Sequence, residues 1–371
     1  TRLGTSYLYG LQEAGDGHGL ANPLAVLATP KHFIGDGGTA WGSSQTAGYQ
    51  LDQGDMQVDE ATLRQLYLPP YQAAIQTGAR SIMVSFSSWN GVKMHAQKYW
   101  ITDVLKGELG FQGFIVSDWG AIDQIYPENY YKSVVAAINA GVDMNMVPYD
   151  YVRFINAMKR GVMKGDISLD RINDAVSRIL TVKYKLGLFY QPYGDPSMQS
   201  VVGSDEHRTL ARQAVRQSLV LLKNENGILP IRPQQKIAVI GALAKFPRYQ
   251  GSGSSIVNPT KVSSALDGFA ELGIDAVYHP GYALNDTINE TLALEAVAGA
   301  ENCDVAIVFA GLTNEYESEG FDRDDLSLPK QQNELIHRVA SAQPNTVVVL
   351  AGGAPVEMPW LGQVRAVLNM L

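Results

Sequence analysis

Cysteine is nearly absent from this chain of 371 residues, which contains a single one, Cys303. One cysteine excludes a disulfide framework and a thiolate metal site. The six histidines include no close His-x-x-x-His pair, so their spacing also argues against zinc. Cys303 precedes an apolar run, and we predict that its side chain packs in a core. We therefore expect no metal and no other cofactor.

Clusters of positive charge and long apolar runs are missing as well. The formal net charge is −8, and the sequence contains no run of lysine and arginine. Nucleic acid is therefore not an expected partner, because binding to phosphates needs clustered cations. No uninterrupted apolar stretch approaches the roughly 20 residues that span a bilayer. Nothing in the sequence indicates the oligomeric state.

The first half of the chain alternates short apolar runs with helical patterns. The runs that predict strands are 25–29, 81–86, 113–117 and 142–147. The patterns that predict helices are 59–76, 101–109, 130–139, 151–163 and 169–186. This alternation predicts a parallel sheet with right-handed crossovers. Four strands are fewer than the eight of a (β/α)8 barrel. We favour a partial barrel over residues 1–189, with its first strands upstream of Thr1, and the alternative is an open sheet.

The second half predicts a different α/β unit. Residues 190–204 are rich in proline, glycine and serine, which indicates a linker. A helical pattern follows at 205–222, and a second one covers 330–342. The runs that predict strands here are 237–240, 305–310 and 346–350. Residues 205–371 are therefore expected to form an α/β/α sandwich with an open, mostly parallel sheet and an incomplete C-terminus.

The segment 114–120 ends an apolar run abruptly in Asp118, Trp119 and Gly120. Asp118 is expected at the carboxyl end of a buried strand, where α/β barrels place their active sites. The flat ring of Trp119 could stack on a sugar. The alternative from this segment alone is that Asp118 caps a helix that begins at Ala121.

An acidic loop follows the predicted strand 305–310 and contains Glu315, Glu317 and Glu319. Acidic loops are usually solvated, which is the simpler interpretation. Glycoside hydrolysis, however, uses two carboxyl groups, and the chain offers one such group at the sheet edge of each predicted domain. Spacing alone does not choose among the three glutamates.

Two glycine-rich segments complete the set of candidate loops. Lys31 and His32 precede a glycine-rich turn and can donate hydrogen bonds to sugar hydroxyls. As a lone pair they could equally be surface residues. The run 251–255 is compatible with an anion nest, a hydroxyl-binding loop or a flexible turn.

Taken together, these segments resemble glycoside hydrolase family 3, and the first half is most similar to its β-glucan exohydrolase branch. The similarity runs through nearly all of the chain. The motifs that carry it are Lys31-His32-Phe33, Met83-Val-Ser-Phe86-Ser-Ser-Trp-Asn-Gly91, Val116-Ser-Asp118-Trp119-Gly120, Gly251-Ser-Gly-Ser-Ser255 and Ser318-Glu319-Gly-Phe-Asp-Arg323. The resemblance implies an N-terminal barrel, a C-terminal sandwich and a retaining exo-β-glycosidase that acts on glucosides or β-glucan oligosaccharides.

The resemblance also implies roles for single residues. Asp118 matches the family's nucleophile, and Glu319 matches the acid/base of members with this loop. The other positions match residues that line the pocket for the terminal sugar: Lys31, His32, Met83, Phe86, Trp119 and Ser254. Phe86 stands where the family usually has tyrosine. Secretion or a periplasmic location is likewise implied by the family alone.

Within the family, the N-acetylglucosaminidase branch is disfavoured. That branch uses an Asp/His dyad in a loop whose counterpart here, 35–48, contains no histidine. The family's upstream Asp and Arg ligands would precede Thr1, so we expect a fragment of a larger enzyme with little activity by itself. A catalytically silent carbohydrate-binding fragment or homologue is the main alternative. A second alternative is an unrelated barrel enzyme that uses Asp118 as a metal ligand or base.

Overall fold

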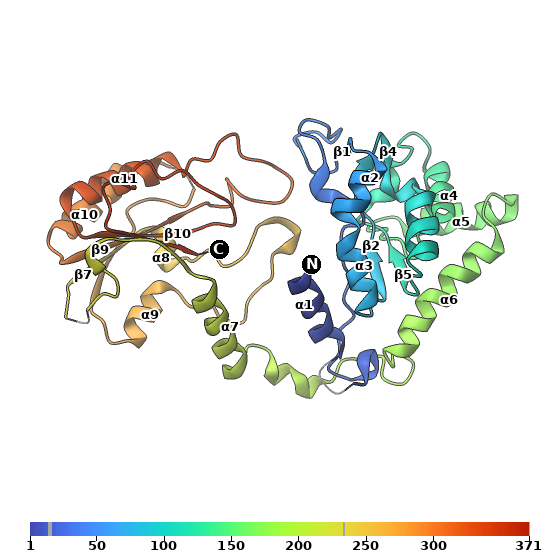
Figure 1. The fold of residues 1–371 in the computed structure, drawn as a ribbon, viewed down its shortest axis with the longest axis horizontal. Helices are drawn as coiled ribbons and strands as arrows, with labels where there is room; N and C mark the ends of the chain where they lie inside the picture. Colours follow the sequence, from blue (N-terminus) through green and yellow to red (C-terminus); the bar gives the residue numbers. More distant parts are fainter. Residues whose placement is uncertain (14–16, 233, 286, 371) are drawn as a thin grey trace. The chain divides into compact units, whose positions relative to one another are not determined.

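The computed structural model describes residues 1–13, 17–232, 234–285 and 287–370 and divides the chain into two compact units (Figure 1). The units are Thr1–Gly194 and Asp195–Leu371. The division falls inside the segment 190–204, for which we predicted a linker. The exact bounds of the two domains and the linker stay predictions.

The first unit consists of short strands and longer helices. Its helical segments are α1 (Arg2–Glu13), η1 (Gly19–Ala21), η2 (Asp36–Gly38), α2 (Glu60–Thr62), η3 (Leu63–Tyr67), α3 (Pro69–Gln76), η4 (Met94–Ala96), η5 (Tyr99–Glu108), η6 (Ala121–Gln124), α4 (Tyr130–Ala140), α5 (Tyr151–Lys164) and α6 (Leu169–Lys185). Its strands are β1 (Asp55–Met56), β2 (Ser81–Met83), β3 (Ser88–Trp89), β4 (Val92–Lys93) and β5 (Phe114–Val116).

Three of the four predicted strands of the first half lie side by side in a parallel row, which Phe33, shortly after the segment 25–29, extends on one side; only β2 and β5 are regular strands. β2 pairs with β5, and Met83 lies opposite Val116. On the outer sides, Phe33 forms a single parallel bridge with Val84, and Val116 forms one with Met144. Consecutive parallel segments joined by helices are the arrangement of a barrel wall, as the sequence predicted.

The predictions of regular strands at 25–29 and 142–147 are wrong, and side chains explain why. The N–H groups of Val26 and Ala28 donate to the Leu11 carbonyl and to the Gln12 side chain, both in α1, so they have no strand partner. In the second segment, the carboxylate of Asp143 accepts the Ile115 N–H at 2.8 Å. A side chain therefore takes a ladder position that a backbone carbonyl would otherwise fill.

The helical pattern at 59–76 forms three successive segments rather than one helix. Asp59 caps α2, η3 is a π-helical stretch, and α3 begins with Pro69 and Pro70. Proline is tolerated in the first turn because its missing N–H has no intrahelical partner there. The segment 101–109 lies in η5, which is π-helical throughout. For α4, α5 and α6 the sequence predicted the bounds to within one residue.

An ionic network lies beneath β5. The buried carboxylate of Asp143 accepts a hydrogen bond from Lys106 at 2.8 Å and also pairs with Arg171. Asp174 joins the network through Arg171 and Arg178. These side chains come from η5, α6 and the segment after α4, so the network ties three elements to the strand that leads to Asp118.

The second unit is an α/β sandwich. Its helical segments are η7 (Pro196–Val201), α7 (Asp205–Ser218), η8 (Glu225–Gly227), α8 (Ala242–Lys245), η9 (Gly253–Ser255), α9 (Ala265–Glu271), α10 (Glu290–Glu301) and α11 (Lys330–Ala342). Its strands are β6 (Val220–Asn224), β7 (Ile237–Ile240), β8 (Ala276–His279), β9 (Val305–Gly311), β10 (Thr346–Ala351) and β11 (Ala366–Met370).

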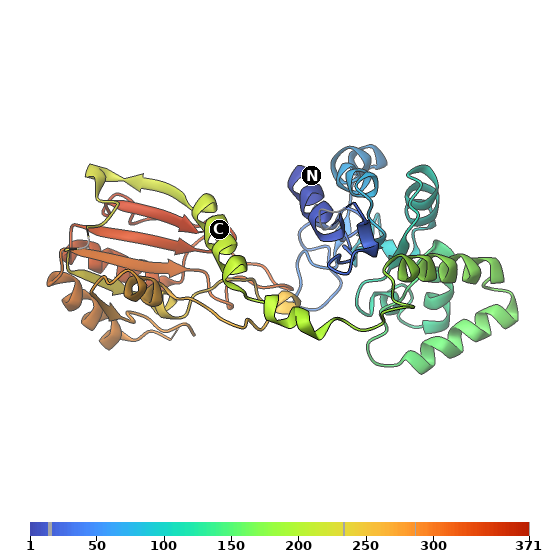
Figure 2. The same ribbon diagram turned by 90° about the horizontal axis from the view of Figure 1, so that it is seen from below.

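The six strands form one sheet in the order β6-β11-β10-β9-β7-β8, which Figure 2 shows with its strands side by side. Every pair is parallel except β11 with β6. Helices α10 and α11 pack on one face and α9 on the other. The chain direction across the sheet reverses between β7 and β9, and such a switch point is where open α/β sheets bind ligands.

The prediction of a helix over 205–222 is wrong at its end. α7 stops at Ser218, and the chain continues as β6, an antiparallel edge strand paired with β11. The apolar run Val220-Leu221-Leu222 fits either state, and pairing with a strand far along the chain decides between them. No predicted strand corresponds to β8 or β11.

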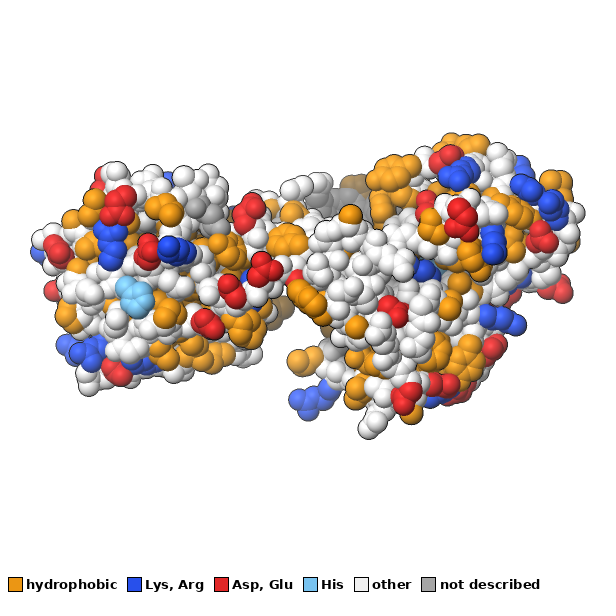
Figure 3. Space-filling view, turned by 90° about the horizontal axis from the view of Figure 1, so that it is seen from above, with side chains coloured by type: hydrophobic (Ala, Val, Ile, Leu, Met, Phe, Trp, Pro, Cys, Tyr) orange, Lys and Arg blue, Asp and Glu red, His pale blue; other side chains and the backbone are white. Residues whose placement is uncertain are grey.

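No helix among the described residues is long and apolar enough to cross a membrane. On the face shown in Figure 3, lysine and arginine side chains are interspersed with aspartate and glutamate rather than gathered into one patch.

Candidate active site

Asp118 stands just beyond the carboxyl end of β5, which finishes at Val116. Its side chain is 19% exposed, and its Oδ1 accepts the N–H of Trp119 at 2.7 Å. The alternative role of Asp118 as a helix cap is wrong, because Gly120 occupies the N-cap position of η6 and no side chain caps it. The carboxylate is therefore available for another partner.

His95 supports the backbone of Asp118 from the buried side. The N–H of Asp118 donates to His95 Nε2 at 3.0 Å, so Nε2 is the unprotonated nitrogen of the ring. His95 is fully buried, and burial lowers its pKa to about 3. The ring is therefore neutral near pH 7 and accepts this hydrogen bond permanently.

His32 approaches Asp118 from the side of the sequence motif Lys31-His32-Phe33. Its Nε2 lies 3.7 Å from Asp118 Oδ2, and its Nδ1 lies 3.0 Å from Asp36 Oδ2. The hydrogen bond to Asp36 raises the pKa of His32 and outweighs the opposite effect of burial. The structure thus brings two predicted site residues, His32 and Asp118, together.

The remaining predicted residues of the first unit differ in their surroundings. The Trp119 ring is 60% exposed, and Lys31 is exposed. Phe86 contacts His95 edge-on, with ring centroids 6.5 Å apart, and Lys93 Nζ lies 5.4 Å from the centre of the Phe86 ring. Met83 packs in an apolar cluster that includes Val116 and Val182.

In the second unit, Glu319 is held by the glycine-rich run 251–255. The sequence alone was compatible with an anion nest, a hydroxyl-binding loop or a flexible turn there. The Oε2 atom of Glu319 accepts the N–H of Ser254 at 2.7 Å and also the Ser254 hydroxyl. A Cβ on Gly253 would lie 2.6 Å from the Glu319 Cβ, so only glycine allows this approach. The run 251–255 therefore binds a carboxylate of the chain itself.

The other two glutamates of the acidic loop have different surroundings. Glu317 Oε2 pairs with Arg248 Nη1 at 2.6 Å, and Arg248 Nη2 donates to the Glu317 carbonyl at 2.5 Å. The ion pair thereby fixes the acidic loop to the segment after β7 that contains Arg248. Glu315 is exposed and lines an open pocket of about 440 Å³ with Arg248 and Tyr249.

Sequence reasoning missed four residues of these two sites: Asp36, His95, Arg248 and Gly253. Asp36 had a detectable signal, because it lies four residues after His32 in a glycine-rich turn. His95 and Arg248 are distant in sequence from the groups they hold, and no local pattern marks them. Among the described residues, no three His, Cys, Asp or Glu side chains converge in a way that could hold a metal ion.

The fold and the two sites define a class: a barrel-like unit with a carboxylate after a parallel strand, followed by a doubly wound α/β sandwich with a second carboxylate on a loop. The profile of the glycosyl hydrolase family 3 N terminal domain matches residues 1–182, and that of the family 3 C-terminal domain matches residues 219–371. The chain belongs to glycosyl hydrolase family 3.

Relatives and solved structures agree with this assignment. The chain is 41% identical over 321 residues to thermostable beta-glucosidase B of Acetivibrio thermocellus, which covers 85% of this chain and 40% of the relative. It is 36% identical to an exo-α-(1→6)-L-arabinopyranosidase of Bifidobacterium longum, over 85% of this chain and 41% of the relative. A relative from Salmonella typhimurium, named periplasmic beta-glucosidase, is 29% identical over 93% of this chain and 48% of its own length.

Among solved structures, the beta-glucosidase of Listeria innocua in complex with glucose superposes with a TM-score of 0.86 at 29% identity. The match covers 99% of this chain and 50% of that chain. The chain spans about half the length, or less, of each of these four proteins.

Proposed function

We propose that this chain carries the nucleophile and the acid/base of a retaining exo-β-glycosidase that removes terminal β-linked glucosyl residues from glucosides or β-glucan oligosaccharides. The observation that carries the proposal is the setting of Asp118. Its carboxylate follows a buried parallel strand, is 19% exposed, and lies 3.7 Å from a histidine whose pKa is raised by a hydrogen bond to a second carboxylate, that of Asp36.

The proposed reaction has two displacements. Asp118, ionised, attacks the anomeric carbon, and the bond from that carbon to the leaving oxygen breaks as Glu319 donates a proton to it. A glycosyl ester of Asp118 results. Glu319, now ionised, takes a proton from water, whose oxygen attacks the anomeric carbon and releases Asp118. Retention requires the two carboxyl groups to lie about 5–5.5 Å apart during the reaction.

The contacts of Glu319 suit the acid/base role. The Ser254 N–H and hydroxyl fix one of its oxygens, and the exposed side chain can exchange its proton with water. Glu317 is the weaker choice, since its carboxylate already pairs with Arg248.

The other predicted residues are proposed to bind the terminal sugar. His32 and Lys31 donate hydrogen bonds to its hydroxyls, Trp119 offers an exposed ring for stacking, and Phe86, Met83 and Ser254 complete the pocket. Phe86 has no hydroxyl to offer, so hydrogen bonds to the sugar fall to the charged side chains.

The choice of sugar is part of the proposal. Relatives are named for glucosides and for an arabinopyranoside. We expect this chain to prefer a glucose-like sugar, and a panel of aryl β-glucoside, β-xyloside and α-L-arabinopyranoside substrates ranks the three directly. A secreted or periplasmic location is proposed on the family resemblance and on the one relative named periplasmic.

Two matched substitutions test the roles. Asp118→Asn is expected to abolish hydrolysis of both an activated and an unactivated aryl glucoside. Glu319→Gln should lower turnover of the unactivated substrate by roughly 10²–10⁴-fold, and far less for the activated one, because a good leaving group needs little protonation. Glu315→Gln, on the same loop, serves as the control and should leave both rates unchanged.

Equal losses on both substrates in Glu319→Gln would argue against the acid role. A wild-type chain that binds glucose but turns over neither substrate would favour the alternative of a silent carbohydrate-binding protein.

A further inference from the structure

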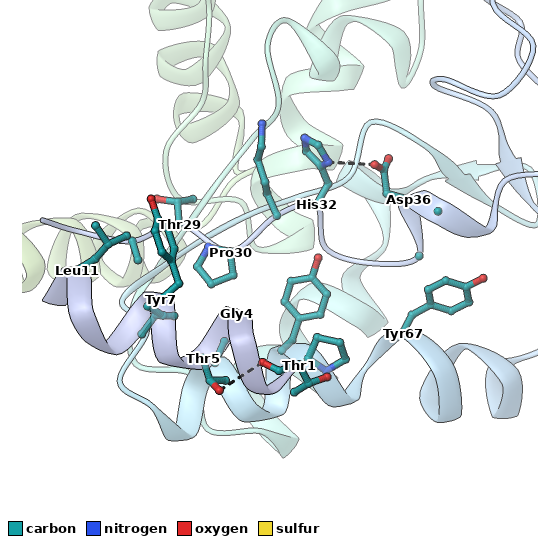
Figure 4. A pocket seen from close by; sticks show the side chains of 18 of the residues that line it. Thr1, Gly4, Thr5, Tyr7, Leu11, Thr29, Pro30, His32, Asp36 and Tyr67 are labelled. Carbon is teal, nitrogen blue, oxygen red and sulfur yellow. Dashed lines mark hydrogen bonds and ion pairs between the residues drawn. The ribbon is translucent and has the colours of Figure 1, made fainter. Parts of the chain in front are cut away.

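His32 lies between two carboxylates from different segments. Its Nδ1 is 3.0 Å from Asp36 Oδ2, and its Nε2 is 3.7 Å from Asp118 Oδ2. Figure 4 shows the His32 ring and the Asp36 side chain turned toward each other at the edge of a pocket. One ring therefore connects Asp36 to the carboxylate that we propose as the nucleophile.

Asp36 is itself held in place. The Ser85 hydroxyl donates to Asp36 Oδ1 at 3.1 Å, and Ser85 and Ser87 share a buried hydrogen bond of 2.6 Å. Gly35, just before Asp36, has φ +85°, and a Cβ there would lie 1.9 Å from the Met56 sulfur. The turn that contains Asp36 is thus fixed by the backbone conformation of Gly35 and by Ser85, which lies in the segment after β2.

The charges around His32 favour its protonated form. Asp36 and Asp118 face the ring with opposite charge, and Lys31 is the one like charge that acts on it among the groups that shift its pKa. Burial opposes ionisation of Asp36, yet the hydrogen bond from His32 lowers its pKa overall. Each partner therefore stabilises the charged form of the other.

The geometry favours the same protonation state. If Nδ1 donates to Asp36, a neutral ring would turn the lone pair of Nε2 toward the Asp118 carboxylate, and the two would repel. Only the imidazolium carries a proton on both nitrogens and can donate in both directions. His95, whose ring accepts the Asp118 N–H, is the contrast: its pKa is lowered by burial and by the like charge of Lys93, and it accepts a hydrogen bond as a neutral ring.

We propose that Asp36 is a positioning residue for the glycosidase reaction, which anchors His32 through Nδ1 and keeps its Nε2–H directed toward Asp118 and the bound sugar. The proposal rests on the proposed function for the roles of Asp118 and His32. Asp36 acts through His32 and does not itself contact the reacting atoms.

The direct test is an NMR titration of the His32 ring in the full chain, with its signal assigned by its loss in His32→Gln. Asp36→Asn keeps the size of the side chain and removes its charge, so the titration midpoint of His32 should fall. Ser85→Ala keeps the charge and loosens its support, so we expect a smaller fall. Asp59→Asn, an exposed helix cap in the same unit, is the control and should leave the midpoint unchanged.

The kinetic test is a double-mutant cycle on an aryl β-glucoside. Asp36→Asn should lower kcat/KM by about ten- to hundredfold, the range for losing one hydrogen bond to a charged group, and should move the alkaline limb of the pH profile to lower pH. In the His32→Gln background the same substitution should have little further effect, because its influence passes through His32.

An unchanged His32 midpoint in Asp36→Asn would overturn the proposal, as would full additivity in the cycle. Absence of any hydrolysis by the wild-type chain would instead count against the proposed function. The titration reads the ring itself, so it still decides whether Asp36 sets the state of His32.

Discussion

Asp118 follows its strand by two residues and has a largely covered side chain, whereas Glu319 lies on an exposed loop well beyond the end of β9 at Gly311. The Asp118 backbone is held by a neutral, buried histidine, and its side chain faces a second histidine, His32, whose pKa is raised by Asp36. Glu319 is held by one hydroxyl and one backbone N–H of Ser254. A carboxylate is thus largely covered at the end of a strand in the first unit and lies on an exposed loop in the second.

The difference between the surroundings of Asp118 and Glu319 matches the role of each carboxyl group in the proposed reaction. A nucleophile must stay in place, and fixed neighbours in a covered site hold it there. An acid/base must take up and release a proton in each cycle, which an exposed position allows. We therefore expect substitutions in the ionic network that supports β5 to reduce stability and substitutions around Glu319 to reduce activity.

The largest expected effect is on stability, at Asp143 beneath β5. Asp143→Asn removes the buried carboxylate between Lys106 and Arg171 and leaves both cations with the more exposed Asp174, and we expect a loss of about 3–5 kcal/mol in the free energy of unfolding. Denaturant unfolding of the first unit measures it. Glu108→Gln breaks an exposed pair with Arg64 in the same unit and should cost less than about 1 kcal/mol. Equal costs for the two variants would mean that the buried network does not brace β5.

The next effect is on activity, at Gly253. Gly253→Ala places a methyl group 2.6 Å from the Glu319 Cβ, so the carboxylate must move, and turnover should fall roughly ten- to hundredfold. Gly273→Ala is the matched control: Gly273 also has a positive φ, +65°, but nothing lies within 4 Å of its Cβ position. It should share the backbone strain without the loss of activity. If both variants lose activity alike, strain rather than displacement of Glu319 is responsible.

The smallest expected effect is a pH dependence of stability from His95. The folded-state pKa is about 3 and the ordinary value is about 6.5, so between them the unfolded chain binds more protons. The free energy of unfolding should therefore fall as the pH is lowered through this range. His32 has the opposite sign, because its raised pKa makes its stabilisation strongest at acid pH and lost as the pH rises.

The measurement compares urea midpoints at pH 7 and pH 4.5. His95→Gln should lose less stability on acidification than the wild type, whereas His207→Gln, which changes an exposed residue of α7, should behave like the wild type. A His95→Gln variant as acid-sensitive as the wild type would contradict the prediction.

How far the sequence predicted the fold depends on whether a segment carries its own signal. α11 and β7 lie where the pattern placed them, because the helical periodicity of one and the apolar run of the other are local. The pattern failed at 25–29 and at Val220–Asn224, where hydrogen bonds to distant segments decide the state. A strand forms only if a neighbouring strand pairs with it through backbone hydrogen bonds, and a short stretch of sequence does not contain that neighbour.

The candidate sites divide in the same way. Asp118, Glu319 and His32 stand in recognisable motifs, so the sequence alone marked them as candidates and identified the family to which the chain belongs. Which atoms hold them was decided by the tertiary structure: Asp36 and His95 around the first site, Arg248 and Gly253 around the second. The physical reason is that the identity of a residue alone determines the chemical group of its side chain. Its protonation and orientation depend on neighbours that only folding brings within a few ångströms.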